Sequence, residues 1–524
     1  MPGSNPAPPS GGDDFIQLVQ NFPFISIFLP ILCAIACMPL RAQASKYITY
    51  ACHVALTVLS AAVLAFTLRT GESFTYVMGH FPSPFGNEIR AGALEAFMAL
   101  LFCFVSLVSI AGGQRDIFRE LNEKRINVFY LMMNMLTSAL LAMVYTNDLF
   151  TAYVFIEIIT ISACYIVAAR PGGRPTAASM VYLIMSLVGS CLILIAIALL
   201  YGVTGHLLMP GLSRSVHALA ASGDYRVPLF VLTGLMTAGL AIKTALFPFH
   251  SWLPNAHASA TTAASAVLSG LIIKCYLFLL IKLEYRIYGL DIIAELQISN
   301  LMLIFGAFGI VYGSLMARRQ RDIKQMLSYS SIAQIGFISV AMGLNTEAGT
   351  AVACFHIAAH AVGKAMLFVA AGGLSAVSGH AKDFDSLRGA ARRDPLSGAA
   401  FIIGGLAISG IPPFFGFFSK MYLSVAAIDT PLAAIVISVA VVVATVLSAM
   451  YYFPAISCIL GAGGKSPKLL KKHDPVPEGH AEKGESPSLV YRAAVGAFIA
   501  ASLFLGFFSR PVISMIEKGL AVFG

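Results

Sequence analysis

The feature that most constrains this chain is a series of long apolar runs that begins near residue 22 and continues to the C-terminal region. An apolar run of about 18 residues or more is typical of a transmembrane helix, because a helix of that length crosses the hydrocarbon core. Only helices and closed barrels satisfy every backbone polar group in lipid. We therefore predict an all-α, multi-pass transmembrane helical bundle of about fourteen spans, near residues 22–40, 47–67, 93–112, 127–146, 148–169, 178–202, 228–247, 260–283, 299–317, 328–344, 349–375, 397–419, 432–460 and 489–509.

Composition supports a membrane protein. Of the 524 residues, 58% are hydrophobic and 11% are charged, whereas soluble domains are about 25% charged. The net charge of +9 is better explained by basic cytoplasmic loops than by binding to nucleic acid, so we expect no nucleic-acid partner. The nine cysteines show no CxxC pair and no iron–sulfur spacing. The sequence therefore predicts no cofactor and no active site of its own.

Basic residues are concentrated in the loops that follow odd-numbered spans, as at Arg115, Arg170 and Arg318. The positive-inside rule places these loops in the cytoplasm and both termini on the outer, periplasmic face of the cell inner (plasma) membrane. Asp322 and Lys324 fall in such a loop, and we expect them at the protein surface.

The spans divide into units. The seventh span is interrupted at 247–250 and the twelfth at 411–416, and a further interruption is expected at 253–257. Broken helices in matching positions of two five-helix units indicate inverted repeats, although chance placement of prolines gives the same pattern. The predicted organisation is a disordered N-terminal tail (1–21), flanking helices of spans 1–3 (22–126), a first repeat of spans 4–8 (127–283), a second repeat of spans 9–13 (299–460), a cytoplasmic loop (461–488) and a C-terminal helix, span 14 (489–524).

Charged residues are expected inside the membrane on several spans. Glu157 lies in the fifth span, Lys243 in the seventh, Lys274 in the eighth, and Lys420 just beyond the break in the twelfth. A charge at mid-membrane costs about 2.5–3.5 kcal/mol or more, so such residues are usually functional. We expect Glu157 to face Lys243, with a static ion pair as the alternative. Lys420 either joins the same chain or extends to the membrane surface.

Histidines add groups that change charge near neutral pH. His356, His360 and Lys364 follow one another at intervals of four residues, which places them on one helix face. The absence of an HExxH pattern makes a metal site the weaker interpretation, so we expect a proton relay and no metal. His250 and His257 flank the break after the seventh span and either take up protons or cap helices. The predicted mid-membrane proton pathway comprises Glu157, Lys243, Lys274, His356, His360, Lys364 and Lys420.

Three motifs carry a resemblance to a known family. The chain contains LFPFHSWLPNAHASATTAASAVLSGLIIK, DIKQMLSYSSIAQIGF and ISGIPPFFGFFSKMYL. These resemble the antiporter-like subunits of respiratory complex I and of Mrp-type multisubunit Na⁺/H⁺ antiporters, over roughly residues 90 to 455. The stretch LLYGVTGHLLMPGLS and the lysine at position 420 are most similar to the Mrp D-type subunit and to the related subunit of membrane-bound hydrogenases. The N-type subunit of complex I also has lysine there.

The resemblance implies a proton-translocating subunit (H⁺ or Na⁺/H⁺ antiport) of an Mrp-type antiporter complex. The alternative is a proton-pumping subunit of a redox-driven complex, of the complex I N/M type or the hydrogenase type. Glu157 would be the fifth-span acid, Lys243 its partner, Lys274 the connecting lysine and Lys420 the terminal lysine, and His356 and His360 would match the polar axis. The implied partners are other antiporter-like subunits, small hydrophobic subunits, lipid, H⁺ and, in an exchanger, Na⁺.

The sequence departs from the family pattern where alanines and threonines at 260–263 replace a proline-containing run.

The competing function classes are a quinone-binding redox subunit, which requires no motif, and a structural anchor. An anchor has no reason to bear the cost of buried charges.

Overall fold

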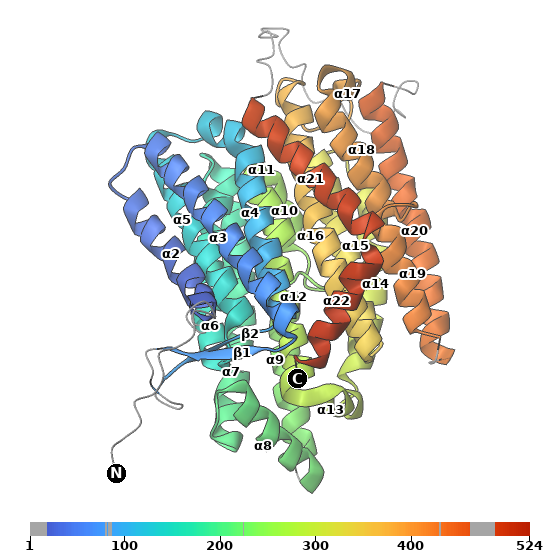
Figure 1. Cartoon of the computed structure of the whole chain (residues 1–524). Helices are drawn as coiled ribbons and strands as arrows, with labels where there is room; N and C mark the ends of the chain where they lie inside the picture. The colour runs from blue at the N-terminus through green and yellow to red at the C-terminus, as the bar shows by residue number, and fades with distance from the viewer. Residues whose placement is uncertain are drawn as a thin grey trace.

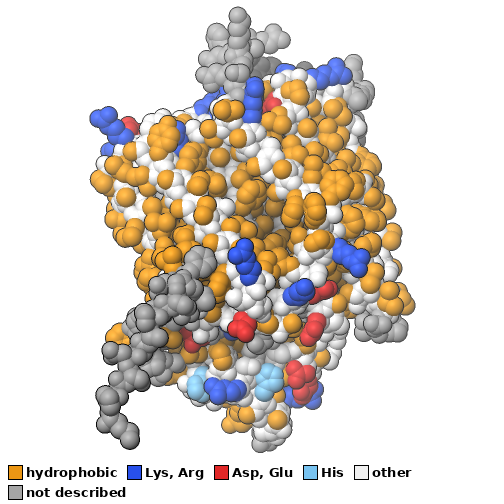
Figure 2. Space-filling model, in the orientation of Figure 1, with side chains coloured by type: hydrophobic (Ala, Val, Ile, Leu, Met, Phe, Trp, Pro, Cys, Tyr) orange, Lys and Arg blue, Asp and Glu red, His pale blue; other side chains and the backbone are white. Residues whose placement is uncertain are grey.

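The computed structural model describes residues 18–78, 81, 86–223, 225–428, 431–461 and 488–523. Long helices run between two ends of the molecule (Figure 1). We call the end that carries Arg115, Arg170 and Arg318 the basic end, and the opposite end, which carries a short β-hairpin, the hairpin end. Figure 2 shows hydrophobic side chains over the middle of one face, with charged side chains toward both ends. This distribution matches a protein whose middle lies in lipid.

The helices of the first half follow the predicted spans closely. They are α2 (Phe22–Cys37), α3 (Ala42–Thr70), α4 (Ala93–Glu120), α5 (Glu123–Tyr145), α6 (Leu149–Ala168), α7 (Gly173–Thr204), α8 (Met209–Ser222), α9 (Arg226–Lys243), α10 (Trp252–Ser259), α11 (Thr262–Val267), the π-helical turn η2 (Leu268–Ile272) and α12 (Ile273–Leu283).

The second half begins with the π-helical turn η3 (Glu284–Tyr288) and α13 (Gly289–Glu295). It continues with α14 (Ile298–Arg319), α15 (Ile323–Gly343), α16 (Glu347–Ala376), α17 (Ala390–Arg393), α18 (Pro395–Ser409), α19 (Phe415–Ala426), α20 (Pro431–Leu460), α21 (Leu489–Phe507) and α22 (Ser509–Ala521). In the part of the chain that is described, twelve helices are long and apolar enough to cross a membrane, and α2 and α18 are shorter apolar helices. The all-α, multi-pass membrane class is confirmed, whereas the span count and the repeats stay predictions.

The most buried helices form the centre of the bundle. Every residue in the most apolar 18-residue window of α16 is buried, and the same holds for the continuous helical stretch from α11 to α13, while α15 is 94% buried. By contrast, only 28% of the corresponding window of α20 and 33% of that of α3 are buried. The charged residues of α12 and α16 are therefore held in the protein interior, away from lipid.

Both predicted helix interruptions are present. The chain leaves helical geometry between Lys243 and Trp252, and again between Ser409 and Phe415. The further interruption expected at 253–257 was wrong, because these residues lie in α10. Pro254 sits in the first turn of that helix, where a missing backbone N–H needs no partner. The helix ends instead at Ser259, and Thr261 caps α11 by accepting from the backbone N–H of Ala264 at 3.3 Å.

Several elements were not anticipated from the sequence. Strands β1 (Phe74–Val77) and β2 (Glu88–Ala91) pair antiparallel, with Phe74 opposite Ala91. Helices α8 and α13 also lie at the hairpin end (Figure 1). The segment 489–524 holds two helices, α21 and α22, instead of one. The predicted tail falls largely, and the loop 461–488 almost wholly, outside the described residues.

Candidate functional site

One face of α16 carries three buried polar side chains. His356 is 1% exposed, and His360 and Lys364 are fully buried. The rings of His356 and His360 are stacked with their centroids 5.9 Å apart, and His356 Nε2 lies 3.1 Å from Gln334 Oε1. Lys364 Nζ donates to the carbonyl oxygen of Leu327 at 3.0 Å. The helical spacing therefore produces a continuous polar face inside the bundle.

Lys274 approaches this face from α12. It is fully buried, and its Nζ donates to the carbonyl oxygen of Ser269 in the π-helical turn η2. The charge of Lys274 acts through space on His356, His360 and Lys364. These groups from two helices thus form one electrostatically connected cluster.

His257, on α10, adjoins the same cluster. Its ring stacks on Phe368 with centroids 4.5 Å apart, and Phe368 lies one turn beyond Lys364 on α16. The charges of Lys364 and Lys274 both act on the imidazole. His250 and His257 were the two predicted points of proton uptake, and of these His257 adjoins the cluster.

Most ring nitrogens of these histidines have no hydrogen-bond partner within the protein. Both nitrogens of His257, both of His360 and Nδ1 of His356 are buried and unpaired. Leaving a buried polar atom unpaired costs about 1–3 kcal/mol, and buried water is the usual partner of such atoms. The unpaired ring nitrogens therefore leave hydrogen-bonding groups open at His257 and along the polar face of α16.

Lys420 lies at the second helix break. It is 5% exposed, so it does not extend to the membrane surface. Its Nζ donates to Ser409 O at 2.9 Å and to Thr445 Oγ1 at 3.0 Å. Ser409 ends α18, and the carbonyl end of a helix attracts positive charge. A side chain at Gly410 (φ +83°) would place a Cβ 2.7 Å from this Nζ, and the charge of Lys420 acts on His356.

Lys243 lies at the first helix break. It is the last residue of α9 and is 1% exposed. Its Nζ donates to Thr160 Oγ1 at 2.9 Å and lies 5.5 Å from the ring centroid of Tyr276, which is on α12 two residues after Lys274. An aromatic ring therefore lies between Lys243 and the helix of the central cluster.

The expected direct contact between Glu157 and Lys243 is not formed. Glu157 acts on Lys243 through space, but its Oε1 is buried without a hydrogen-bond partner. Thr160 stands three residues further along α6, on the same side of the helix, and its hydroxyl takes the position beside the ammonium. The hydroxyl that accepts from Lys243 itself donates to the backbone oxygen of Ile156 at 2.9 Å, so it holds the ammonium against α6 without binding Glu157.

Close packing of α7 and α9 positions Lys243. A Cβ at Gly239 would lie 2.6 Å from Ile193 Cγ1 and 2.7 Å from the carbonyl oxygen of Gly189. A Cβ at Gly189 would lie 2.8 Å from Gly239 O and 3.2 Å from Lys243 Cγ. Small residues at a crossing allow membrane helices to approach closely.

His250 lies apart from the cluster. Its ring packs against Tyr312 and Phe247, with centroids 4.6 Å and 5.5 Å away. It is 8% exposed. The structure thus separates the two histidines that flank the break.

Lys324 was expected at the surface, and that prediction was wrong. Lys324 is 4% exposed, and its Nζ donates to Ala260 O at 3.0 Å. Lys382 Nζ donates to Ala258 O at 2.9 Å, so two cations bind the carbonyl end of α10, where backbone acceptors lack helical partners. Burial, and then repulsion from Arg170, lowers the pKa of Lys382, which lies in the loop after α16. The charge of Lys324 also acts on His257.

Lys282, in α12, and Arg286, in η3, are further buried cations that the sequence analysis did not single out. Lys282 is fully buried, and its Nζ donates to Val144 O at 2.8 Å and Thr146 O at 2.7 Å, at the end of α5. Arg286 donates to Asn147 Oδ1 at 2.7 Å. These contacts join α5 to the end of α12 and indicate a structural role. Within the described residues, no three His, Cys, Asp or Glu side chains are grouped as metal ligands.

Comparisons with known proteins identify the family of this chain. Residues 146–448 match the family described as NADH:quinone oxidoreductase/Mrp antiporter, TM. NADH-quinone oxidoreductase subunit N of Desulforudis audaxviator is 31% identical over 95% of this chain and 98% of its own length. A Staphylococcus haemolyticus protein that bears the name antiporter subunit mnhD2 is 29% identical over 82% of this chain and 84% of its own.

Solved structures share the fold. A chain of the Mrp complex from Dietzia sp. superposes with a TM-score of 0.82 at 22% identity, covering 96% of this chain and 97% of that one. A chain of the archaeal membrane-bound sulfane sulfur reductase gives 0.81 at 24% identity, with 97% of both chains covered. The chain belongs to the NADH:quinone oxidoreductase/Mrp antiporter family and is an antiporter-like, multi-pass membrane subunit.

Proposed function

We propose that this chain conducts protons along a buried series of lysines and histidines, as one subunit of a multisubunit Mrp-type cation/proton antiporter complex. The observation that carries the proposal is the cluster of Lys274, His356, His360 and Lys364, which is buried in the middle of the bundle. Keeping such groups in a membrane is costly, and proteins retain them where ions or protons move.

The contacts also give an order for these groups. Glu157 and Lys243 form one end, and the ring of Tyr276 lies between Lys243 and the helix of Lys274. The charge of Lys274 acts on His356 and His360 of the α16 face, and the charge of Lys420 acts on His356 from the other side. A proton that arrives on one of these groups changes the charge that its neighbour experiences, so protonation at one end favours release further along.

A redox-driven complex is the second candidate. The relative named NADH-quinone oxidoreductase subunit N matches 95% of this chain, so the same series of groups would there respond to electron transfer in other subunits. In either setting the partners would be other antiporter-like and small hydrophobic subunits. By the positive-inside rule, the basic end would face the cytoplasm, and both termini the outside, of the plasma membrane.

The test is proton movement in membrane vesicles that contain the whole complex, with Lys274→Ala compared with the native chain. Lys46→Ala is the matched control, because Lys46 is also buried but packs over the ring of Tyr47 at 4.3 Å, outside the cluster. We expect at least a tenfold loss of proton movement for Lys274→Ala alone, with normal assembly. Native rates for Lys274→Ala would refute proton conduction through the cluster.

The same vesicles distinguish the two settings. Proton movement that follows an imposed Na⁺ gradient without an electron donor supports the antiporter. Proton movement that requires an electron donor and an acceptor, and is indifferent to Na⁺, supports the redox-driven complex and excludes the Mrp-type assignment.

A further inference from the structure

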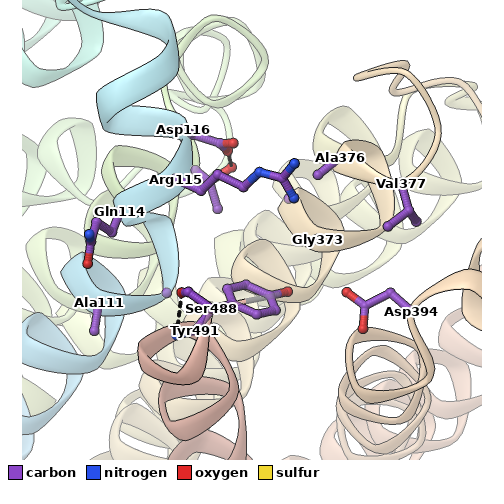
Figure 3. A pocket seen from close by; sticks show the side chains of 13 residues that line it. Ala111, Gln114, Arg115, Asp116, Gly373, Ala376, Val377, Asp394, Ser488 and Tyr491 are labelled. Atoms are coloured by element: carbon purple, nitrogen blue, oxygen red, sulfur yellow. Dashed lines mark hydrogen bonds between the residues drawn. The ribbon is translucent and has the colours of Figure 1, made fainter. Parts of the chain in front are cut away.

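A pocket of about 230 Å³ opens at the basic end of the molecule. Figure 3 shows it between the end of α4, the end of α16 and the starts of α18 and α21. Carboxylates line it on two sides, with Asp116 on α4 and Asp394 just before α18, and the phenol of Tyr491 projects between them (Figure 3). Arg115 lies at the same pocket, so the wall carries two acidic groups and one basic group.

The pocket is lined by the last turns of α16, beyond the polar residues of that helix. Gly372 and Ala376 line it, and they continue the four-residue spacing that runs through His356, His360 and Lys364. Gly372 is eight residues beyond Lys364 (372 − 364), which is about 12 Å along a helix that rises about 1.5 Å per residue. Phe368, with His257 stacked on it, occupies the turn between them.

Hydrogen bonds join the helices that line the pocket. Thr262, the first residue of α11, donates to Asp116 Oδ2. A Cβ at Gly372 would lie 2.6 Å from Thr262 Oγ1, so the glycine leaves room for this bond beside α16. On the opposite side, Tyr491 Oη lies 2.5 Å from Ser397 Oγ.

A charged route continues inward from Asp116. Its carboxylate and that of Glu120 act on the ammonium of Lys324, and Lys324 acts in turn on His257. The groups between the pocket and the cluster are therefore, in order, a carboxylate, an ammonium and an imidazole. His257 is fully buried, and both of its ring nitrogens are free of protein partners.

We infer that this pocket is the entrance through which protons from the solution at the basic end reach His257, with Asp116 as the first acceptor. The inference rests on the proposed function, since it names where that function takes up its protons. A carboxylate at a water-filled mouth binds a proton from solution and releases it to water or to a neighbouring base. The stacked pair of His257 and Phe368 separates the mouth from Lys364.

The test places a removable obstruction in the pocket. Ala376→Cys, in the whole complex, is treated with a membrane-impermeant, positively charged methanethiosulfonate, and proton movement is measured with the extent of labelling by mass spectrometry. Ser386→Cys is the matched control, because Ser386 is exposed in the loop beyond α16 and does not line the pocket. The native chain, treated in the same way, controls for its own cysteines, of which Cys191 is exposed.

We expect the labelled Ala376→Cys complex to lose at least tenfold in proton movement, to recover on reduction of the added disulfide, and to react only from the basic side. Labelled Ser386→Cys should move protons at the native rate. Full labelling of Ala376→Cys with an unchanged rate overturns the inference, and if Lys274→Ala is inactive in the same assay the proposed function stands. Should Ala376→Cys not assemble, Ala111→Cys on the α4 wall of the pocket replaces it.

Discussion

Replacing Thr160 by valine tests how the ammonium of Lys243 is held. Valine has nearly the shape of threonine but lacks the hydroxyl that accepts from Lys243 Nζ at 2.9 Å. Glu157 makes no ion pair with this lysine in the described structure, so the hydroxyl is its nearest acceptor from α6. The substitution therefore removes the hydrogen bond while leaving the packing almost unchanged.

The expected magnitude follows from the type of bond. A hydrogen bond to a charged group contributes about 1.5–3 kcal/mol, and about 1.4 kcal/mol corresponds to a tenfold change in an equilibrium. The contact of Lys243 with the Tyr276 ring at 5.5 Å is present before and after the substitution, so it does not offset the loss. We expect the ratio of charged to neutral Lys243 to fall roughly ten- to a hundredfold, and proton movement to slow by at least tenfold.

The assay is proton movement per assembled complex in vesicles, with Thr160→Ser as the conservative variant that keeps a hydroxyl. Thr57→Val is the matched control, because its hydroxyl donates only to the backbone oxygen of His53 in its own helix. The account predicts slow transport for Thr160→Val and near-native transport for the other two. If Thr160→Val transports as fast as the native chain, the hydroxyl has no part in holding the ammonium and the reasoning fails.

Four further substitutions have definite expected outcomes. Lys420→Ala should reduce proton flux per assembled complex at least tenfold, because its buried ammonium ends the series; native flux would contradict this. His360→Phe should do the same, because it keeps a ring and removes both nitrogens, and a transporting variant would exclude His360 from the path. Gly239→Ala places a Cβ 2.6 Å from Ile193 Cγ1 and should lower stability by about 1–3 kcal/mol, seen as a lower Tm of the purified complex; an unchanged Tm would show that α7 and α9 separate easily. Lys282→Met should lower Tm while flux per assembled complex stays native, and a selective loss of flux would place Lys282 on the path.

Local features of the sequence were the predictable part of this structure. The common face of His356, His360 and Lys364 follows from helical periodicity alone. The helix breaks near Pro248 and Pro412 follow from the missing N–H and the fixed backbone of proline. These inferences need no knowledge of how helices pack.

Tertiary contacts were not predictable from one sequence. Lys324 sits beside Asp322 and Gln325, which is typical of a surface loop, and its burial appears only when the carbonyl end of α10 meets it. Likewise Thr160 looks like an ordinary small helix residue until α9 brings Lys243 to it. The acceptors of Lys282 are likewise hidden from one sequence, because the end of α5 that it caps lies 136 residues earlier in the chain.

The most direct test of proton conduction through the bundle is proton movement by the Lys364→Ala complex. Lys364 lies between His360 and the stacked pair of Phe368 and His257, and its Nζ is held by Leu327 O and Tyr452 Oη at 3.0 Å and 3.3 Å. Its removal leaves the entrance pocket and Lys420 in place. The account predicts a fully assembled complex whose proton movement falls at least tenfold, while Lys46→Ala remains native. An assembled Lys364→Ala complex that moves protons at the native rate would contradict it.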